Sequence, residues 1–243
     1  MVTIVGSKLR SRFSTLAAFT RYNTSLIFAG KFVYFLLLAI VLFLVAVITY
    51  TAQQDVPPGP AAIFYFLLAP GILLTFYPSA YALQSDVDAR MLETLFGIPD
   101  YRYKVWLARH LIQQLVTALL LALLAYLCQV ALADFPLDLM VFHLAFPILF
   151  FSSAAFMCAT ITRSGNGTAA IIVVVGLIFW ILSQEALQGS RWNLFYNPFD
   201  HRDEFAALLQ EDTTFYNRLY LLVGSVLATL LGLLRLQQRE RFV

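Results

Sequence analysis

The sequence predicts an all-α membrane protein with six transmembrane helices, and three observations lead to this prediction. Of the 243 residues, 60% are hydrophobic and 12% are charged, whereas a soluble globular domain has roughly 45–50% and 25%. Six apolar segments are each long enough to cross a bilayer, which takes about 20 helical residues. Lys and Arg are concentrated in alternate segments between these six, as the positive-inside rule requires of a multi-pass protein.

The predicted spans are residues 32–50, 61–83, 111–133, 139–162, 168–187 and 219–236. The first has neither a charge nor a break between Phe32 and Tyr50. Because it is longer than the apolar region of a cleaved signal peptide, about 7–15 residues, we expect a retained helix. No stretch between the spans is long enough to fold on its own, so residues 1–243 are predicted to form a single membrane domain.

The distribution of charge predicts how the chain is oriented. Thirteen of the 16 Lys and Arg residues fall in the N-terminal arm, the second and fourth loops and the C-terminal tail. The other three, Arg191, Arg202 and Arg218, share the first, third and fifth loops with nine acidic residues. Positive residues stay on the cytoplasmic side. We therefore expect a multi-pass plasma (inner) membrane protein with both termini in the cytoplasm.

Composition also argues against several function classes. A net charge of +2 is too small to indicate a nucleic-acid partner. Cys128 and Cys158 lie inside apolar runs, which does not favour a disulfide framework or a metal site. His110, His143 and His201 do not form a metalloprotease motif, so we do not expect an enzyme. A secondary transporter would place ionisable residues at mid-membrane, and the predicted spans contain none there.

Two cytoplasmic segments have amphipathic helical patterns. In the N-terminal arm, Leu9, Phe13, Leu16 and Ala17 fall on one face, which predicts a basic helix on the membrane surface. The alternative is a plain basic segment that only fixes topology.

The turn at 164–167, between the fourth and fifth spans, is expected to depend on its two glycines.

The second loop is predicted to contain a short amphipathic helix. Ser85 and Asp88 form a capping-box pattern at its start, and Gly97 and Pro99 end it. Its apolar face comes from i, i+4 pairs: Met91 with Leu95, and Leu92 with Phe96. Such a helix offers a protruding surface to a cytoplasmic partner; alternatively, it only covers the end of the bundle.

The segment from Asp88 to Leu111, DARMLETLFGIPDYRYKVWLARHL, resembles the membrane subunits of ABC-2 type (type V) ABC transporters. Members of that family have an acidic residue after the second span, a leucine-glutamate-x-leucine element, a proline, a basic or aromatic pair, and a basic residue opening the third span. The matching residues here are Leu92 to Leu95, Pro99, Arg102 with Tyr103, and Arg109. Arg90 and Met91 depart from the pattern, because the family often has small residues there.

The resemblance implies the permease half of an exporter without its own ATPase site. The chain has no phosphate-binding G-x-x-x-x-G-K-[ST] motif. We therefore expect no cofactor on this chain, with ATP and Mg bound by a separate nucleotide-binding subunit. The expected partners are that subunit, the bilayer and a second permease half, either an identical copy or a homologue. The predicted coupling residues are Arg90, Met91, Leu92, Glu93, Leu95 and Phe96.

The expected substrate is amphipathic or hydrophobic: a lipid, a lipid-linked glycan, a peptide or a drug. The predicted pathway or gate residues are aromatic: Tyr34, Phe35, Phe66, Phe76, Phe179, Trp180, Trp192, Phe195 and Phe199. Lipid-facing packing is the alternative role for these side chains. The fifth loop is expected to form short re-entrant helices on the outer surface, one of them containing Phe205, Leu208 and Leu209. The alternative functions are a non-transporting membrane scaffold and a secondary transporter.

Overall fold

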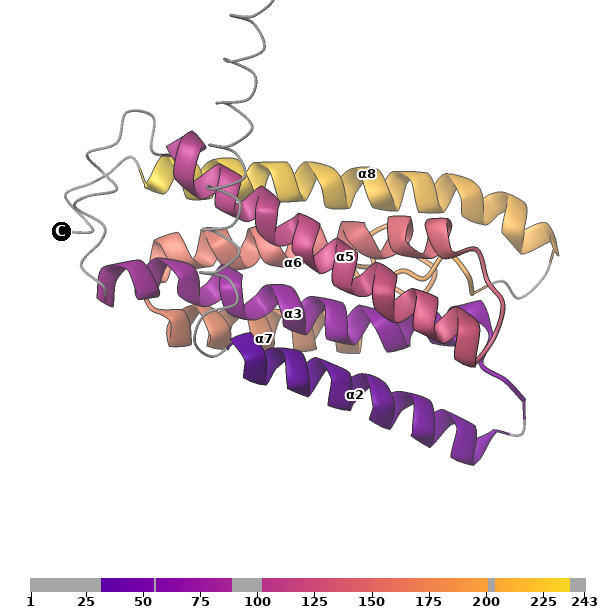
Figure 1. Cartoon of the computed structure of the whole chain (residues 1–243). Helices are drawn as coiled ribbons and strands as arrows, with labels where there is room; N and C mark the ends of the chain where they lie inside the picture. Colours follow the sequence, from indigo (N-terminus) through magenta and orange to yellow (C-terminus); the bar gives the residue numbers. More distant parts are fainter. Residues whose placement is uncertain (1–31, 55, 89–101, 201–203, 237–243) are drawn as a thin grey trace, which may run out of the picture.

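The computed structural model describes residues 32–54, 56–88, 102–200 and 204–236. Within these ranges the chain is a bundle of long helices without a β-strand (Figure 1). A short π-helix, η1 (Arg102–Leu107), leads directly into one of them. The helices are α2 (Phe32–Gln53), α3 (Pro60–Asp88), α5 (Ala108–Ala131), α6 (Leu137–Thr162), α7 (Gly165–Gln184) and α8 (Glu204–Arg235).

Six of these helical segments are long and apolar enough to cross a membrane, which confirms the predicted number of spans. The largest difference is in the last span, because α8 begins at Glu204 instead of Leu219. The run predicted as a separate outer helix, with Phe205 and Leu208, is therefore the beginning of α8. No Gly or Pro occurs between Glu204 and Leu219 to end the helix, so it continues without a break.

The first residue of α2 and the last of α8 lie at the same end of the bundle, as an even number of spans requires (Figure 1). At that end α3 finishes and η1 begins, on either side of residues 89–101; we call it the 89–101 end. The opposite end carries the connection between α7 and α8; we call it the 185–200 end. The amphipathic helix predicted around Leu9 to Ala17 lies outside the described residues.

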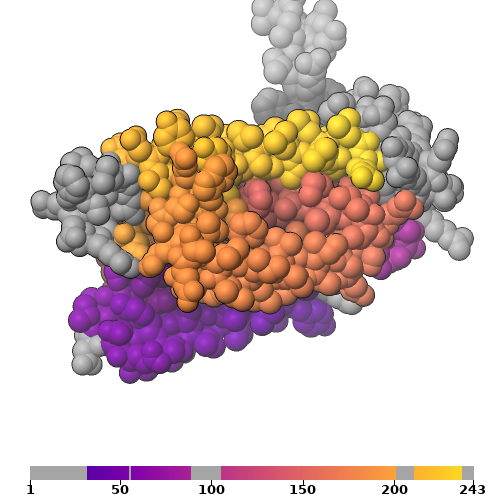
Figure 2. Space-filling model, turned by 180° about the vertical axis from the view of Figure 1, so that it is seen from behind, coloured from indigo at the N-terminus to yellow at the C-terminus, as the bar shows by residue number. Residues whose placement is uncertain are grey.

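Helix α6 lies at the centre and packs against α3, α5, α7 and α8, while α2 packs mainly on α3. More than half of the α6 span (56%) is buried, compared with 17% for α2 and for α7. Figure 2 shows α7 and the segment after it lying between α8 along one edge and α2 with α3 along the other. The exposed sides of α2 and α7 are almost entirely apolar, as expected for surfaces in contact with hydrocarbon.

Two close approaches depend on glycine. A Cβ on Gly71 would overlap the side-chain end of Ile148 and touch Leu121, so this glycine allows α3 to approach α5 and α6. A Cβ on Gly165 would collide with the ring of Tyr81. The connection between α6 and α7 differs from the prediction, because its left-handed residue is Arg163 (φ 56°) and not a glycine. Gly165 and Gly167 instead form the first turn of α7, which Ser164 caps by accepting from the Gly167 N–H.

We expect Gly71→Val to destabilise the bundle by about 1–3 kcal/mol, because its side chain has to displace Ile148 and Leu121 in a packed core. Gly59→Val is the matched control, since a Cβ at Gly59 meets no atom within 4 Å. Thermal unfolding of the purified variants in detergent measures the difference. Equal unfolding midpoints for the two variants would contradict this account of the helix packing.

Candidate functional site

The predicted coupling residues, Arg90, Met91, Leu92, Glu93, Leu95 and Phe96, lie in the segment 89–101, outside the described residues. The structure does describe the two helical elements that flank this segment, which we call its supports. Helix α3 leads into it and ends at Asp88, and η1 follows it from Arg102. The site is therefore built from these two supports and from what lies behind them in the bundle.

A buried ion pair joins the two supports. The Arg109 guanidinium donates to the Asp86 carboxylate at 2.7 Å, and both side chains are about nine-tenths buried. Asp86 lies in the last turn of α3 and Arg109 in the first turn of α5, so the pair joins the two helices on either side of the segment 89–101. A buried charge without its partner is strongly unfavourable, so this pair is expected to stay closed.

Trp106, on η1, connects the ion pair to other helices at the same end of the bundle. The Arg109 guanidinium lies 5.1 Å from the centre of the Trp106 ring, a cation–π distance. The Trp106 ring packs on Phe156 of α6 and shares a buried cluster with Leu83 of α3 and Leu233 of α8. The start of the third span is thus fixed against α3, α6 and α8. Single turns of π-helix are rare and are frequent at functional sites.

We expect Arg109→Gln to destabilise the protein by about 3–5 kcal/mol, because it leaves the Asp86 carboxylate buried without a counter-charge. The double variant Asp86→Asn with Arg109→Gln should recover much of that loss, since no charge then stays buried. Thermal unfolding of the two single variants and the double variant gives the coupling energy. Simple additivity of the two single effects would show that the pair does not act as a unit.

A set of buried polar side chains continues from the ion pair toward the middle of the bundle. The Gln113 amide nitrogen of α5 lies within hydrogen-bond distance of the Thr75 carbonyl (3.0 Å) and the Ser79 hydroxyl (2.6 Å) on α3. It also lies 3.2 Å from the Ser152 hydroxyl on α6, which is itself 2.8 Å from that of Ser79. Gln113 of α5 therefore bonds to both α3 and α6.

A second branch starts one turn away on the same helices. The His110 Nε2 is 3.2 Å from the Ser153 hydroxyl, which also accepts from the Thr229 hydroxyl of α8 at 3.2 Å. Ser152 and Ser153 are neighbours, so the two branches meet on α6 and link α3, α5, α6 and α8. We call this set the polar seam: Ser79, His110, Gln113, Ser152, Ser153 and Thr229.

An apolar cavity of about 350 Å³ lies between α2 and α7, over α3. Three of the predicted pathway residues line it: Phe76 of α3, Trp180 of α7, and Phe195 of the segment that follows α7. The Phe195 ring stacks on Phe151 and meets the edge of Trp180, at centroid distances of 5.6 and 5.4 Å. Phe195 thus closes the cavity toward the 185–200 end. We call it the aromatic cavity.

The other predicted pathway residues are distributed elsewhere. Tyr34 is 71% exposed on α2, Phe35 stacks on Tyr77, and Phe66 meets Tyr50 edge-on. Phe179 packs against the main core. Trp192 is exposed and stacks on Tyr220, while Phe199 lies against Phe64 and His143. The structure therefore brings Phe76, Trp180 and Phe195 together at one cavity and separates the remaining six.

Residues 185–200 form turns in the structure, where the sequence led us to expect short helices. Asn193 and Asn197 each accept from the backbone N–H two residues on, which makes two Asx turns. Asn217 of α8 donates to the carbonyls of Arg191 (2.9 Å) and Asn193 (2.8 Å). Asn197 donates to the Ala61 carbonyl of α3 at 2.9 Å. These side-chain bonds hold the segment on the end of the bundle without a helix.

Sequence reasoning missed the polar residues at the start of the last span. Arg218 was assigned to the fifth loop, but it lies inside the apolar part of α8 that begins at Glu211, and it donates to the Tyr196 carbonyl. The adjacent pair Asn217-Arg218 at the head of an apolar run was the available signal. In the described part of the chain, no three metal-ligating side chains come together, so we assign no metal site there.

Opening of the 185–200 segment can be measured with cysteines in a Cys128→Ala, Cys158→Ala background. Phe195→Cys should react slowly with a membrane-impermeant thiol reagent in nanodiscs, and Trp192→Cys rapidly, because these positions are 6% and 55% exposed. Adding Asn217→Ala should speed the reaction at Phe195→Cys by about tenfold to thirtyfold, since it removes the two bonds that Asn217 donates to the segment, worth about 1 kcal/mol each.

Asn166→Ala is the control for that experiment, because it removes the hydrogen bond to Tyr81 at the opposite end of the bundle. It should leave the rate at Phe195→Cys unchanged. If Asn217→Ala also leaves that rate unchanged, the asparagine does not hold the segment closed.

Comparison with models of known protein families, with curated proteins and with solved structures finds no match to this chain. The resemblance to ABC-2 permeases therefore rests on the motif between Asp88 and Leu111.

Proposed function

We propose that this chain is the permease half of an ABC exporter of the ABC-2 type. It would work with a separate nucleotide-binding subunit and a second permease half, and move an amphipathic or hydrophobic molecule out of the cytoplasm or the inner leaflet. The observation that carries the proposal is the buried ion pair Asp86–Arg109. It joins the two helices on either side of the segment that contains the predicted coupling residues.

A coupling element must transmit a displacement to the membrane helices, and a flexible loop would not transmit it. Because the ion pair joins α3 to α5, a displacement of the segment 89–101 would act on both helices at once. Trp106 adds α6 and α8 through its buried cluster, and the polar seam joins the same four helices farther in. These continuous contacts support the proposal that a partner moves the segment 89–101, because packed and hydrogen-bonded elements transmit displacement.

The aromatic cavity supports the substrate class. Its wall offers aromatic and aliphatic surface with almost no polar atoms, which favours the apolar part of a lipid, a lipid-linked glycan, a peptide or a drug. It lies between α2 and α7, the two helices whose surfaces are least covered by the rest of the chain. In the exporter proposal the second permease half meets this chain beside the cavity, and Phe195 acts as part of an exit gate.

The proposal also sets the orientation. The 89–101 end would face the cytoplasm, where a nucleotide-binding subunit holds ATP and Mg, and the chain would sit in the plasma (inner) membrane with both termini inside. The 185–200 end would then face outward.

We expect Glu93→Ala and Leu92→Asp to leave the fold intact and to reduce ATP hydrolysis stimulated by the permease at least several-fold, because they alter the surface docked on the ATPase. The measurement is hydrolysis and substrate transport by the complex purified from its native membrane and returned to liposomes. Glu185→Ala, at the opposite end of the bundle, is the matched control and should behave as the unaltered protein. Unchanged hydrolysis and transport in both coupling variants would contradict the assignment.

A secondary transporter is the second candidate, and a specific observation favours it. Arg218 of α8 and His143 of α6 lie inside apolar helices and contact each other, and ionisable residues within spans often belong to ion pathways. Liposomes that contain this chain alone, with a proton gradient and no ATP, separate the candidates. Transport under those conditions supports the secondary transporter; no transport with or without the ATPase subunit supports a membrane scaffold.

A further inference from the structure

Arg218 is a buried cation inside an apolar helix, 5% exposed and seven residues beyond Glu211 on α8. Its guanidinium donates to three neutral acceptors: His143 Nδ1 (3.4 Å), the Asn217 Oδ1 (2.8 Å) and the Tyr196 carbonyl (3.2 Å). A guanidinium has five N–H groups, so two more are available. Among the side chains that the structure describes, no carboxylate pairs with this guanidinium.

This lack of a counter-charge is the unusual feature. At the 89–101 end, the buried Arg109 is matched by the Asp86 carboxylate. Arg218 is buried as deeply, yet the three hydrogen-bond partners that the structure describes for it are all neutral. Neutral acceptors satisfy its hydrogen bonds but not its charge, and an unmatched charge in a low-dielectric setting is costly. A negatively charged group from outside the chain would lower that cost.

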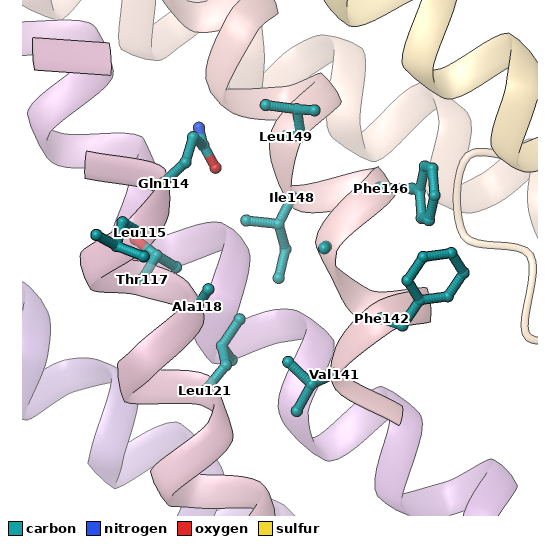
Figure 3. Close-up of a pocket in the computed structure, with 11 residues that line it drawn as sticks. Gln114, Leu115, Thr117, Ala118, Leu121, Val141, Phe142, Phe146, Ile148 and Leu149 are labelled. Carbon is teal, nitrogen blue, oxygen red and sulfur yellow. The ribbon is translucent and has the colours of Figure 1, made fainter. Parts of the chain in front are cut away.

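A second cavity, of about 400 Å³, lies between α5 and α6. Figure 3 shows the side chains of Ala118 and Leu121 on α5 facing those of Val141 and Ile148 on α6 across it. The small Ala145 also lines it, and almost the whole wall is apolar. Water is a poor occupant, because a bound water needs two to four polar partners. The occupant that suits the wall is a hydrocarbon chain.

The cavity and the cation share a wall. Phe142 and Phe146 line the cavity, and the Arg218 guanidinium lies 5.9 Å from the centre of the Phe146 ring. Phe142 meets the edge of His143, one of the three Arg218 acceptors. From Val141 to Leu149 the cavity follows α6 for about 12 Å, since each helical residue rises about 1.5 Å. The charge therefore lies beside the end of the cavity nearer the 185–200 end.

We propose that this site binds an anionic membrane lipid, with one acyl chain in the cavity between α5 and α6 and the headgroup phosphate against Arg218. A lipid in a bilayer places its charged headgroup at the interface and its acyl chain toward the midplane. The unmatched cation and the apolar cavity follow one another in that same order along the membrane normal. The site is separate from the aromatic cavity and does not depend on the proposed transport.

The test is thermal unfolding of the purified chain in detergent micelles that contain either dioleoyl phosphatidylglycerol or dioleoyl phosphatidylcholine at the same mole fraction. The two lipids have identical chains and differ in headgroup charge. Phosphatidylglycerol should raise the midpoint by about 3–10 °C relative to phosphatidylcholine, as expected for a charge-assisted contact in a chain of this size. Equal midpoints in the two lipids would overturn the proposal.

Arg218→Gln should abolish the difference between the two lipids, because it removes the charge and keeps a hydrogen-bond donor. The matched control is Arg191→Gln, which removes an exposed arginine from the same end of the bundle and should keep the full difference. A difference that persists in Arg218→Gln, or one that disappears in Arg191→Gln, would show general surface electrostatics and overturn the assignment to this site.

Ala145→Leu tests the cavity without altering any charge, and it serves if Arg218→Gln does not fold. Filling the cavity should remove most of the phosphatidylglycerol effect, whereas an undiminished effect would overturn the acyl-chain site. Inorganic phosphate at the same concentration should not shift the midpoint. If phosphate alone stabilises the protein as much as phosphatidylglycerol, the site binds a free anion and the lipid proposal is wrong.

Discussion

The amide of Gln113 is the contact on which the arrangement of the helices depends. In a bilayer the lipid tails are as apolar as the helix surfaces, so hydrophobic burial does little to decide which helix packs on which. Polar groups that find hydrogen-bond partners in only one arrangement decide the packing instead. Gln113 has such partners on α3 and α6, and the adjacent pair Ser152-Ser153 extends the connection through His110 and Thr229 to α8. A rotation of α5 about its axis would leave these groups unpaired in hydrocarbon.

The polar seam separates the described helices into two groups. Helices α3, α5, α6 and α8 share it and form a connected unit. Helix α2 packs on that unit through apolar contacts, and α7 adds hydrogen bonds to α3 and α6 at its first turn. The aromatic cavity lies at the boundary between the groups, with α2 and α7 on its sides and Phe151 of α6 in its floor. Apolar contacts impose little geometric specificity, so α2 and the part of α7 beyond its first turn can shift while the unit behind them keeps its shape.

The number of spans and most of their limits could be predicted because hydropathy and the need to satisfy the backbone decide them. The start of α8 could not, since Glu211, Asp212 and Arg218 lower the hydropathy of its first turns although the backbone stays helical. The ion pair was also hidden, because Asp86 and Arg109 are 23 residues apart and meet only when α3 and α5 pack. Aromatic content alone could not say which of nine residues share a cavity, because that depends on helix rotation. The Asx turns at Asn193 and Asn197 were within reach of sequence rules.

The unequal lengths of two spans make this protein sensitive to the thickness of its membrane. The apolar part of α8 has 25 residues and α7 has 20, which correspond to about 38 Å and 30 Å at about 1.5 Å per residue. A hydrocarbon layer of about 30 Å matches α7 and is too thin for an upright α8. The longer helix must tilt, or the bilayer must thicken around it. Thr229, which bonds to α6, and Arg218, which bonds to the 185–200 segment, both lie on α8. A change in bilayer thickness would therefore act on both of these contacts. It would leave α7 comparatively undisturbed.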